Sequence, residues 1–194
     1  AGAAASAYRK HFASFVADPA TGKRAMLDGE SLHAGVRLAK SLATRLEQGG
    51  KSDGKTAGLL KQLRAQRERV EQAGADAELI AAKLEGSSRA LFESNFLTQH
   101  KIMLGLLRWV EHVAEASIAL DANDHAAVSQ HVLALQEPLA LIDAGKALAS
   151  RGEFQDWYRG DQRQVEQFIT SDGKVLLDSA VQNLVQAMAA FSPP

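Results

Sequence analysis

The scarcity of proline constrains this chain more than any other feature. Of its four prolines, Pro193 and Pro194 are the last two residues, so Pro19 and Pro138 are the only internal ones. Proline lacks a backbone N–H and clashes with the preceding helical turn, and residues 20–137 contain none. That stretch is rich in alanine, leucine and long polar side chains, which are good helix formers. The sequence therefore predicts a mostly helical protein.

Apolar residues recur at steps of three and four residues along most of the chain, which is the spacing of one helix face. Tyr8, Phe12 and Phe15 predict a short N-terminal helix that ends near Pro19. Longer apolar stripes occupy residues 32–46, 59–84, 91–120, 128–142 and 177–191. No segment shows the alternation of a β-strand. We therefore expect one all-α domain over residues 1–194, an antiparallel up-and-down bundle of about five long helices plus the short N-terminal helix.

Two of these stripes predict where their helices lie and how they bend. In residues 89–120, Leu91, Ile102 and Trp109 widen the apolar stripe to a second face, so this helix is expected at the centre of the bundle. The stripe at 128–142 keeps its helical phase through Pro138, which predicts one kinked helix rather than two separate helices.

Turn-forming residues mark several helix boundaries. The Gly49-Gly50 pair is expected to end one helix, because glycine accepts the left-handed backbone of a C-terminal cap. Ser52 or Asp53 is expected to cap the next helix, and Asn123 or Asp124 the helix that begins near residue 125.

Charge and composition exclude some classes of partner. The net charge of −1 and the pI near 6.7 argue against nucleic-acid binding, which favours a distinctly basic domain. One basic stretch is interrupted by acidic residues, and its pattern is typical of a solvated helix face. It consists of Lys61, Arg64, Arg67 and Arg69, with Glu68 and Glu71 among them.

The chain contains no cysteine, which excludes thiol catalysis, disulfides and thiolate metal sites. No apolar run reaches the roughly 18–20 residues needed to cross a bilayer, so no membrane span is predicted. Cysteine-free proteins occur on both sides of a membrane. The lack of cysteine therefore does not identify the compartment. A periplasmic or extracellular location is slightly favoured.

Histidines and carboxylates on helices raise the question of a metal site. A di-iron bundle needs a Glu-x-x-His pair on each of two helices. Glu30 and His33 supply this spacing once, and His112 and Glu115 supply it in reverse order. Because a second correctly ordered pair is missing, we predict no metal and no cofactor. The helical histidines are expected at the surface or its boundary: His100, His112, His125 and His131. No catalytic residue is predicted.

The most unusual segment is the non-periodic, aromatic-rich stretch at 151–161. Rings that stack and charged groups that bond hydroxyls are typical of sugar- or peptide-binding surfaces. The predicted binding residues are Trp157, Tyr158, Arg159 and Asp161. The alternative is structural: Phe154 and Trp157 plug the end of the bundle, and Arg159 and Asp161 pair with each other.

A helical hairpin followed by Gly-Glu-Phe-x-x-Trp-Tyr-Arg-Gly-Asp resembles the helical accessory regions at the C-terminal end of large bacterial glycoside hydrolases. The resemblance covers residues 95–165 and depends mostly on residues 157–161. It implies a non-catalytic module that packs against, or dimerises, a catalytic domain. It implies no catalytic residue in this chain.

The sequence thus favours a binding module over an enzyme. The expected partner is another protein or domain, or carbohydrate, and an oligomer is compatible with this. One alternative is a ligand-sensing extracytoplasmic helical bundle, which would be flanked by transmembrane segments. The other is an enzyme with a metal in the bundle core, which would carry bound iron or zinc.

Overall fold

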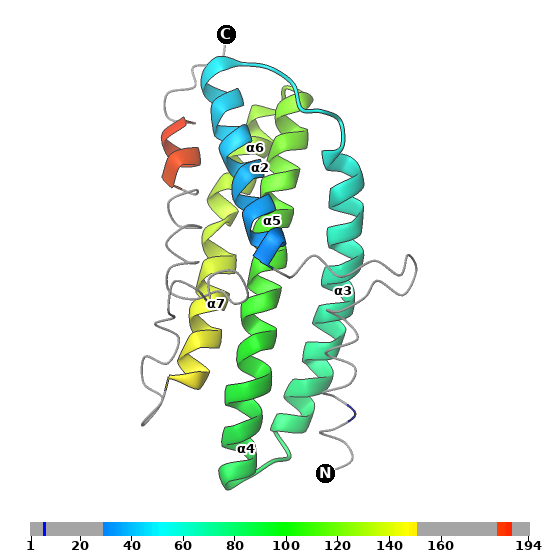
Figure 1. Ribbon diagram of the computed structural model, residues 1–194, viewed down its shortest axis with the longest axis vertical. Coiled ribbons are helices and arrows are strands. Elements are labelled where there is room, and N and C mark those ends of the chain that lie inside the picture. The colour runs from blue at the N-terminus through cyan, green and yellow to red at the C-terminus, as the bar shows by residue number, and fades with distance from the viewer. Residues whose placement is uncertain (1–5, 7–28, 151–181, 188–194) are drawn as a thin grey trace.

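The computed structural model describes residue 6, residues 29–150 and residues 182–187, with side chains from residue 35 onward in the second of these ranges. Every regular element in these ranges is helical. The elements are α2 (Gly29–Gln48), α3 (Thr56–Ala81), α4 (Gly86–Phe92), the π-helical turn η1 (Glu93–Leu97), α5 (Thr98–Asp121), α6 (His125–Ala134) and α7 (Gln136–Ala149). Residues 182–187 are also helical. The long helices alternate in direction along one axis (Figure 1). The predicted all-α, up-and-down bundle is confirmed, while the expected N-terminal helix lies outside the described residues.

Helix α5 is the centre of this bundle, as its two-faced apolar pattern predicts. It packs against α2, α3, α6 and α7. Trp109 and Val113 are fully buried, and Leu106 and Val110 almost so. Close packing on α2 depends on Gly35, because a Cβ there would lie 2.8 Å from the side chain of Val110 and 3.3 Å from the ring of Trp109.

The prediction for one residue of the second apolar face, Leu91, is wrong. Leu91 is exposed, because it lies on α4, a separate short helix ahead of α5 whose buried residue is Phe92. Its neighbours Phe92 and Phe96 are buried instead, with stacked rings whose centroids are 4.8 Å apart. They form a second small core with Ala77 and Leu97, between α3 and the α4–η1 segment.

The prediction of one helix kinked at Pro138 is wrong, because the structure has two helices, α6 and α7, separated at Leu135. Pro138 has no N–H to bond the carbonyl of Ala134, and the helix is interrupted at Leu135. The N–H of Leu135 bonds the carbonyl of Val132, at 3.2 Å, and Leu135 keeps right-handed helical angles. Helix α7 therefore follows directly after α6, with Leu135 as the residue between them. Gly105 of α5 lets the start of α7 approach, since a Cβ there would lie 2.7 Å from the carbonyl oxygen of Pro138.

Two of the predicted helix boundaries are confirmed. Gly49 and Gly50 end α2 with φ of 79° and 112°, and the N–H of Gly49 bonds the carbonyl of Arg45. Asp124 caps α6, because its carboxylate accepts a hydrogen bond from the N–H of Ala127 at 3.0 Å.

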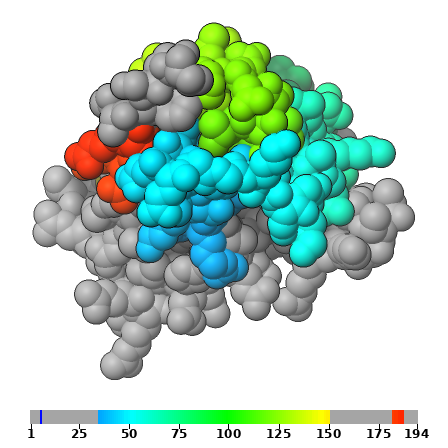
Figure 2. All heavy atoms as spheres, turned by 90° about the horizontal axis from the view of Figure 1, so that it is seen from above, coloured from blue at the N-terminus to red at the C-terminus, as the bar shows by residue number. Residues whose placement is uncertain are grey.

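The predicted cap of α3 is wrong. The residue preceding this helix, Lys55, makes no side-chain cap. Ser52 instead donates through its N–H (2.9 Å) and its hydroxyl to the carboxylate of Asp121 at the end of α5. The α2–α3 connection and the α5–α6 turn therefore lie next to each other at this end of the bundle (Figure 2). A helix cap is a local signal, whereas this contact joins residues far apart in the sequence.

The prediction for His100 is also wrong, because this residue is buried rather than at the boundary. Its ring lies directly over Gly74 of α3, where a Cβ would come within 1.9 Å of the Nε2 atom. Burial, with a smaller effect of Lys101, lowers the pKa of His100 to about 4, and Glu78 and Glu71 oppose this shift. The ring is therefore neutral at pH 7.

Candidate functional site

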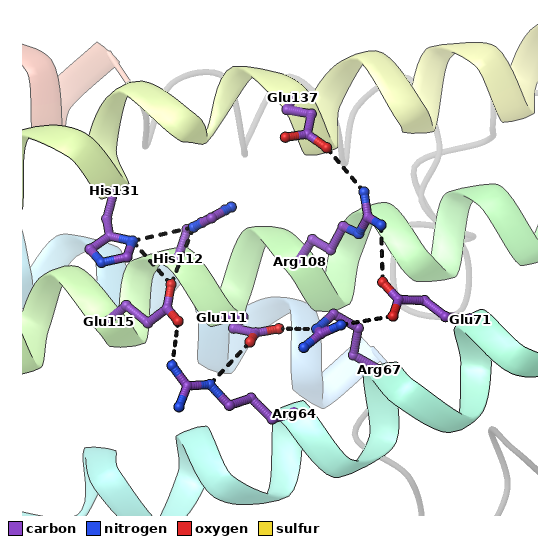
Figure 3. Close-up of polar contacts among 9 residues, drawn as sticks. All are labelled: Arg64, Arg67, Glu71, Arg108, Glu111, His112, Glu115, His131 and Glu137. Carbon is purple, nitrogen blue, oxygen red and sulfur yellow. Dashed lines mark hydrogen bonds and ion pairs between the residues drawn. The ribbon is translucent and has the colours of Figure 1, made fainter.

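Charged side chains line the face of α5 that lies between α3 on one side and α6–α7 on the other (Figure 3). We refer to this group as the polar seam. On α3 its members are three or four residues apart and share one face, whereas those of α5 spread over the two sides that meet α3 and α6–α7. The polar seam consists of Arg64, Arg67 and Glu71 of α3; Arg108, Glu111, His112 and Glu115 of α5; His131 of α6; and Glu137 of α7.

Glu111 anchors the part of the polar seam between α3 and α5. This carboxylate is buried, and it accepts hydrogen bonds from Nε of Arg67 at 2.7 Å and Nε of Arg64 at 3.3 Å. Burial acts to lower the pKa of Arg67, but its ion pairs with Glu111 and Glu71 outweigh this and raise it. A buried carboxylate is costly unless paired, so these two arginines stabilise the ionised Glu111.

This pairing corrects the prediction for the basic stretch. Lys61 is exposed, as expected for a solvated face, but Arg64 and Arg67 turn toward α5. The interrupting Glu71 belongs to the same network, since it bonds Arg67 at 2.7 Å.

Arg108 connects three helices in the middle of the polar seam. One guanidinium nitrogen donates to Glu71 of α3 at 2.9 Å, and another donates to Glu137 of α7 at 3.0 Å. The side chain of Arg108 is 34% exposed. Its charged group is thus held in a fixed place while part of it faces solvent.

The remaining part of the polar seam is a cluster of two histidines and one glutamate between α5 and α6. Oε2 of Glu115 lies 3.3 Å from Nδ1 of His112 and 3.0 Å from Nδ1 of His131. The two Nδ1 atoms are 3.4 Å apart. The second carboxylate oxygen, Oε1, accepts a hydrogen bond from Arg64 at 2.6 Å. This bond is the main reason why the pKa of Arg64 is raised.

A separate network holds the end of the bundle together. Arg45 of α2 is buried and donates to the hydroxyl of Ser117 at 2.7 Å and to the carboxylate of Asp121 at 2.6 Å. Burial opposes ionisation of Asp121, but hydrogen bonds from Ser52 and the charge of Arg45 outweigh it and lower the pKa below 3.8. This network links loop and helices, and its role is structural.

The residues that the sequence predicts as a binding site, Trp157, Tyr158, Arg159 and Asp161, lie outside the described residues. The side chains of Glu30 and His33 are outside them too. Among the described histidines, His112, His125 and His131 are half-buried, as predicted for the boundary.

In the cluster of two histidines and one glutamate, His131 is the member that local sequence spacing does not connect to the others. The three-residue spacing of His112 and Glu115 identifies these two as a pair, whereas His131 lies in another predicted helix. The predicted hairpin contains a signal for the contact between Glu115 and His131. Both residues are eight positions from Asn123, which lies in the turn. In an antiparallel hairpin, positions equally distant from the turn lie opposite each other, so this symmetry predicts the contact.

No protein-family model matches the chain, and no curated protein or solved structure is significantly similar to it. The resemblance to glycoside hydrolase accessory regions therefore stays a prediction. In the part of the chain that the structure describes, none of the helices combines the length and the apolar character needed to cross a bilayer.

Proposed function

We propose that this chain is a non-catalytic helical module that acts by binding another protein domain or a carbohydrate, as part of a secreted carbohydrate-active system. The observation that carries this proposal is the polar seam. It presents charged groups that are partly open to solvent yet held in place by partners on other helices.

The energetic reason lies in preorganisation. Arg64, 51% exposed, is held by Glu111 and Glu115, and Arg108 is held by Glu71 and Glu137. An arginine that is already ordered loses less conformational entropy when a partner binds. Arginine is also enriched among the residues that dominate interface energies, and fixed charges of both signs select a complementary partner.

The aromatic segment 157–161 is the second part of the proposal. Its support comes from composition: two adjacent aromatic residues precede an arginine and are followed closely by an aspartate. Aromatic rings stack on sugar rings, and charged forks bond hydroxyls. The proposed binding residues remain Trp157, Tyr158, Arg159 and Asp161.

The test is affinity gel electrophoresis of the chain in gels that contain soluble polysaccharides, with Trp157→Ala and Tyr158→Ala as variants. Leu133→Ala is the control, because it removes a large exposed side chain from α6. We expect at least one polysaccharide to retard the wild type and the control. The Trp157 and Tyr158 variants should lose this retardation while their melting temperatures stay within about 2 °C of the wild type.

Binding to protein is tested in parallel by isothermal titration calorimetry with any glycoside hydrolase catalytic domain that the same reading frame encodes. The charge reversal Arg108→Glu should weaken that association and reduce its dependence on salt. Loss of several kcal/mol of stability in Trp157→Ala, with no polysaccharide and no neighbouring domain bound, would contradict the proposal. That result would leave Trp157 as a structural plug.

A further inference from the structure

We propose that His112, Glu115 and His131 form a binding site for one divalent transition-metal ion of the zinc class. Nδ1 of each histidine and Oε2 of the glutamate supply the three protein ligands. This inference is independent of the proposed function, because the chain alone would bind the ion.

The spacing of the three atoms fits the ion. Zinc is bound by nitrogen and oxygen at about 2.0–2.1 Å, and in a tetrahedral site neighbouring ligand atoms are then roughly 3.3 Å apart. The observed separations are 3.0, 3.3 and 3.4 Å. The three atoms thus approximate one face of a tetrahedron, and only shifts of a few tenths of an ångström would complete it.

The chemistry of the donors selects the type of metal. Two imidazole nitrogens favour zinc and its neighbours among the transition metals over Mg²⁺ and Ca²⁺, which prefer oxygen ligands. Two histidines and one glutamate are also a known ligand set for zinc sites that keep a fourth position open. Here the side chains are 26%, 15% and 26% exposed for His112, Glu115 and His131, so water can reach that position.

The surroundings orient the carboxylate and set its charge. Arg64 holds Oε1 of Glu115 at 2.6 Å, which leaves Oε2 directed at the two histidines (Figure 3). Such outer contacts fix the geometry of metal ligands. The arginine charge works against the cation, but the polar seam contains three arginines and four glutamates, whose charges sum to −1. A cation is therefore compatible with the site.

A metal here would also join two helices. His112 and Glu115 belong to α5, and His131 belongs to α6. Since the three ligands come together only in the folded hairpin, an ion bound by all three would stabilise the native state and raise the melting temperature. The competing interpretation is a hydrogen-bonded cluster, in which both histidines donate to Glu115 without metal.

The experiment is a calorimetric titration of the chelator-treated full chain with Zn²⁺, in parallel with thermal unfolding with and without Zn²⁺. The variants are His112→Gln, His131→Gln and the two combined, with His125→Gln as a matched control on α6. Far-ultraviolet circular dichroism verifies that each variant is folded.

We expect one Zn²⁺ per wild-type chain, a higher melting temperature with Zn²⁺, and no effect of an equal concentration of Mg²⁺. Each single variant should weaken Zn²⁺ binding by about tenfold or more. The double variant should abolish it, and His125→Gln should leave it unchanged. A wild type that does not bind Zn²⁺ would overturn the proposal and favour the hydrogen-bonded cluster. Binding that persists in the double variant would also overturn it, because the ion would then be held elsewhere.

Discussion

At the scale of single residues, contacts between distant parts of the chain decide the role of a side chain. The contact between His100 and Gly74 is an example, because neither residue belongs to the apolar stripe that predicts its helix. Helices α3 and α5 can approach closely here because Gly74 has no side chain and leaves room for the imidazole of His100. The buried imidazole has a pKa of about 4. Two predictions follow from this pair.

The first concerns the missing side chain of Gly74. In an ordinary helix, glycine to alanine stabilises by up to about 1 kcal/mol. In Gly74→Ala the new methyl group collides with His100, so we expect a loss of about 1–3 kcal/mol. Gly58→Ala, on the same helix, is the matched control because nothing lies within 4 Å of the added Cβ. Urea unfolding of both variants measures this, and a stabilising Gly74→Ala would disprove the close contact.

The second concerns pH. An unfolded histidine binds its proton with a pKa near 6.5, whereas native His100 binds it only near pH 4. Its contribution to stability is therefore complete above pH 6.5 and is lost as the pH falls from there toward 4. Between pH 7 and pH 5 the loss is about 2 kcal/mol. His100→Asn should remove this part of the pH dependence in urea unfolding, and identical slopes in wild type and variant would refute the buried neutral ring.

At the scale of helices, the polar seam shows how charge joins neighbours that apolar stripes bring together. Its ion pairs differ in burial, and their energies should differ accordingly. Glu111→Gln removes the charge of a buried carboxylate that accepts hydrogen bonds from two partly exposed arginines, and it should cost about 2 kcal/mol. Glu137→Gln removes a carboxylate that is 69% exposed, and the change should stay within about 0.5 kcal/mol. Equal effects in chemical denaturation would mean that the seam is uniformly solvated.

The helices themselves were largely predictable from the sequence. Periodicity and glycine placed α2, α3 and α5, because these signals are local, whereas the unbroken apolar phase through Pro138 concealed the break between α6 and α7. Ser52 was missed as a partner of Asp121, and Leu91 was predicted on the wrong side, because tertiary contacts and the end of the bundle decide both. In the candidate site, the pair His112–Glu115 was visible from spacing. His131 required the register of the hairpin.

At the scale of the whole molecule, α5 contributes to both the apolar core and the polar seam. The apolar sides of α5 form the core around Trp109 and Val113, and its charged side forms the middle of the polar seam. The proposed binding surface and the proposed zinc site both depend on this arrangement, because Arg108, His112 and Glu115 all project from α5. If α5 were peripheral, neither would be held in place.

Native-state hydrogen exchange, resolved by residue, tests this central position of α5 most directly. Amides of buried elements exchange only through global unfolding, whereas peripheral helices open locally. We predict that the amides of residues 104–114 are the slowest to exchange and follow the global free energy of unfolding. Those of α4, at the end of the bundle, should exchange much faster. If residues 104–114 exchanged as fast as those of α4, α5 would not be the central helix.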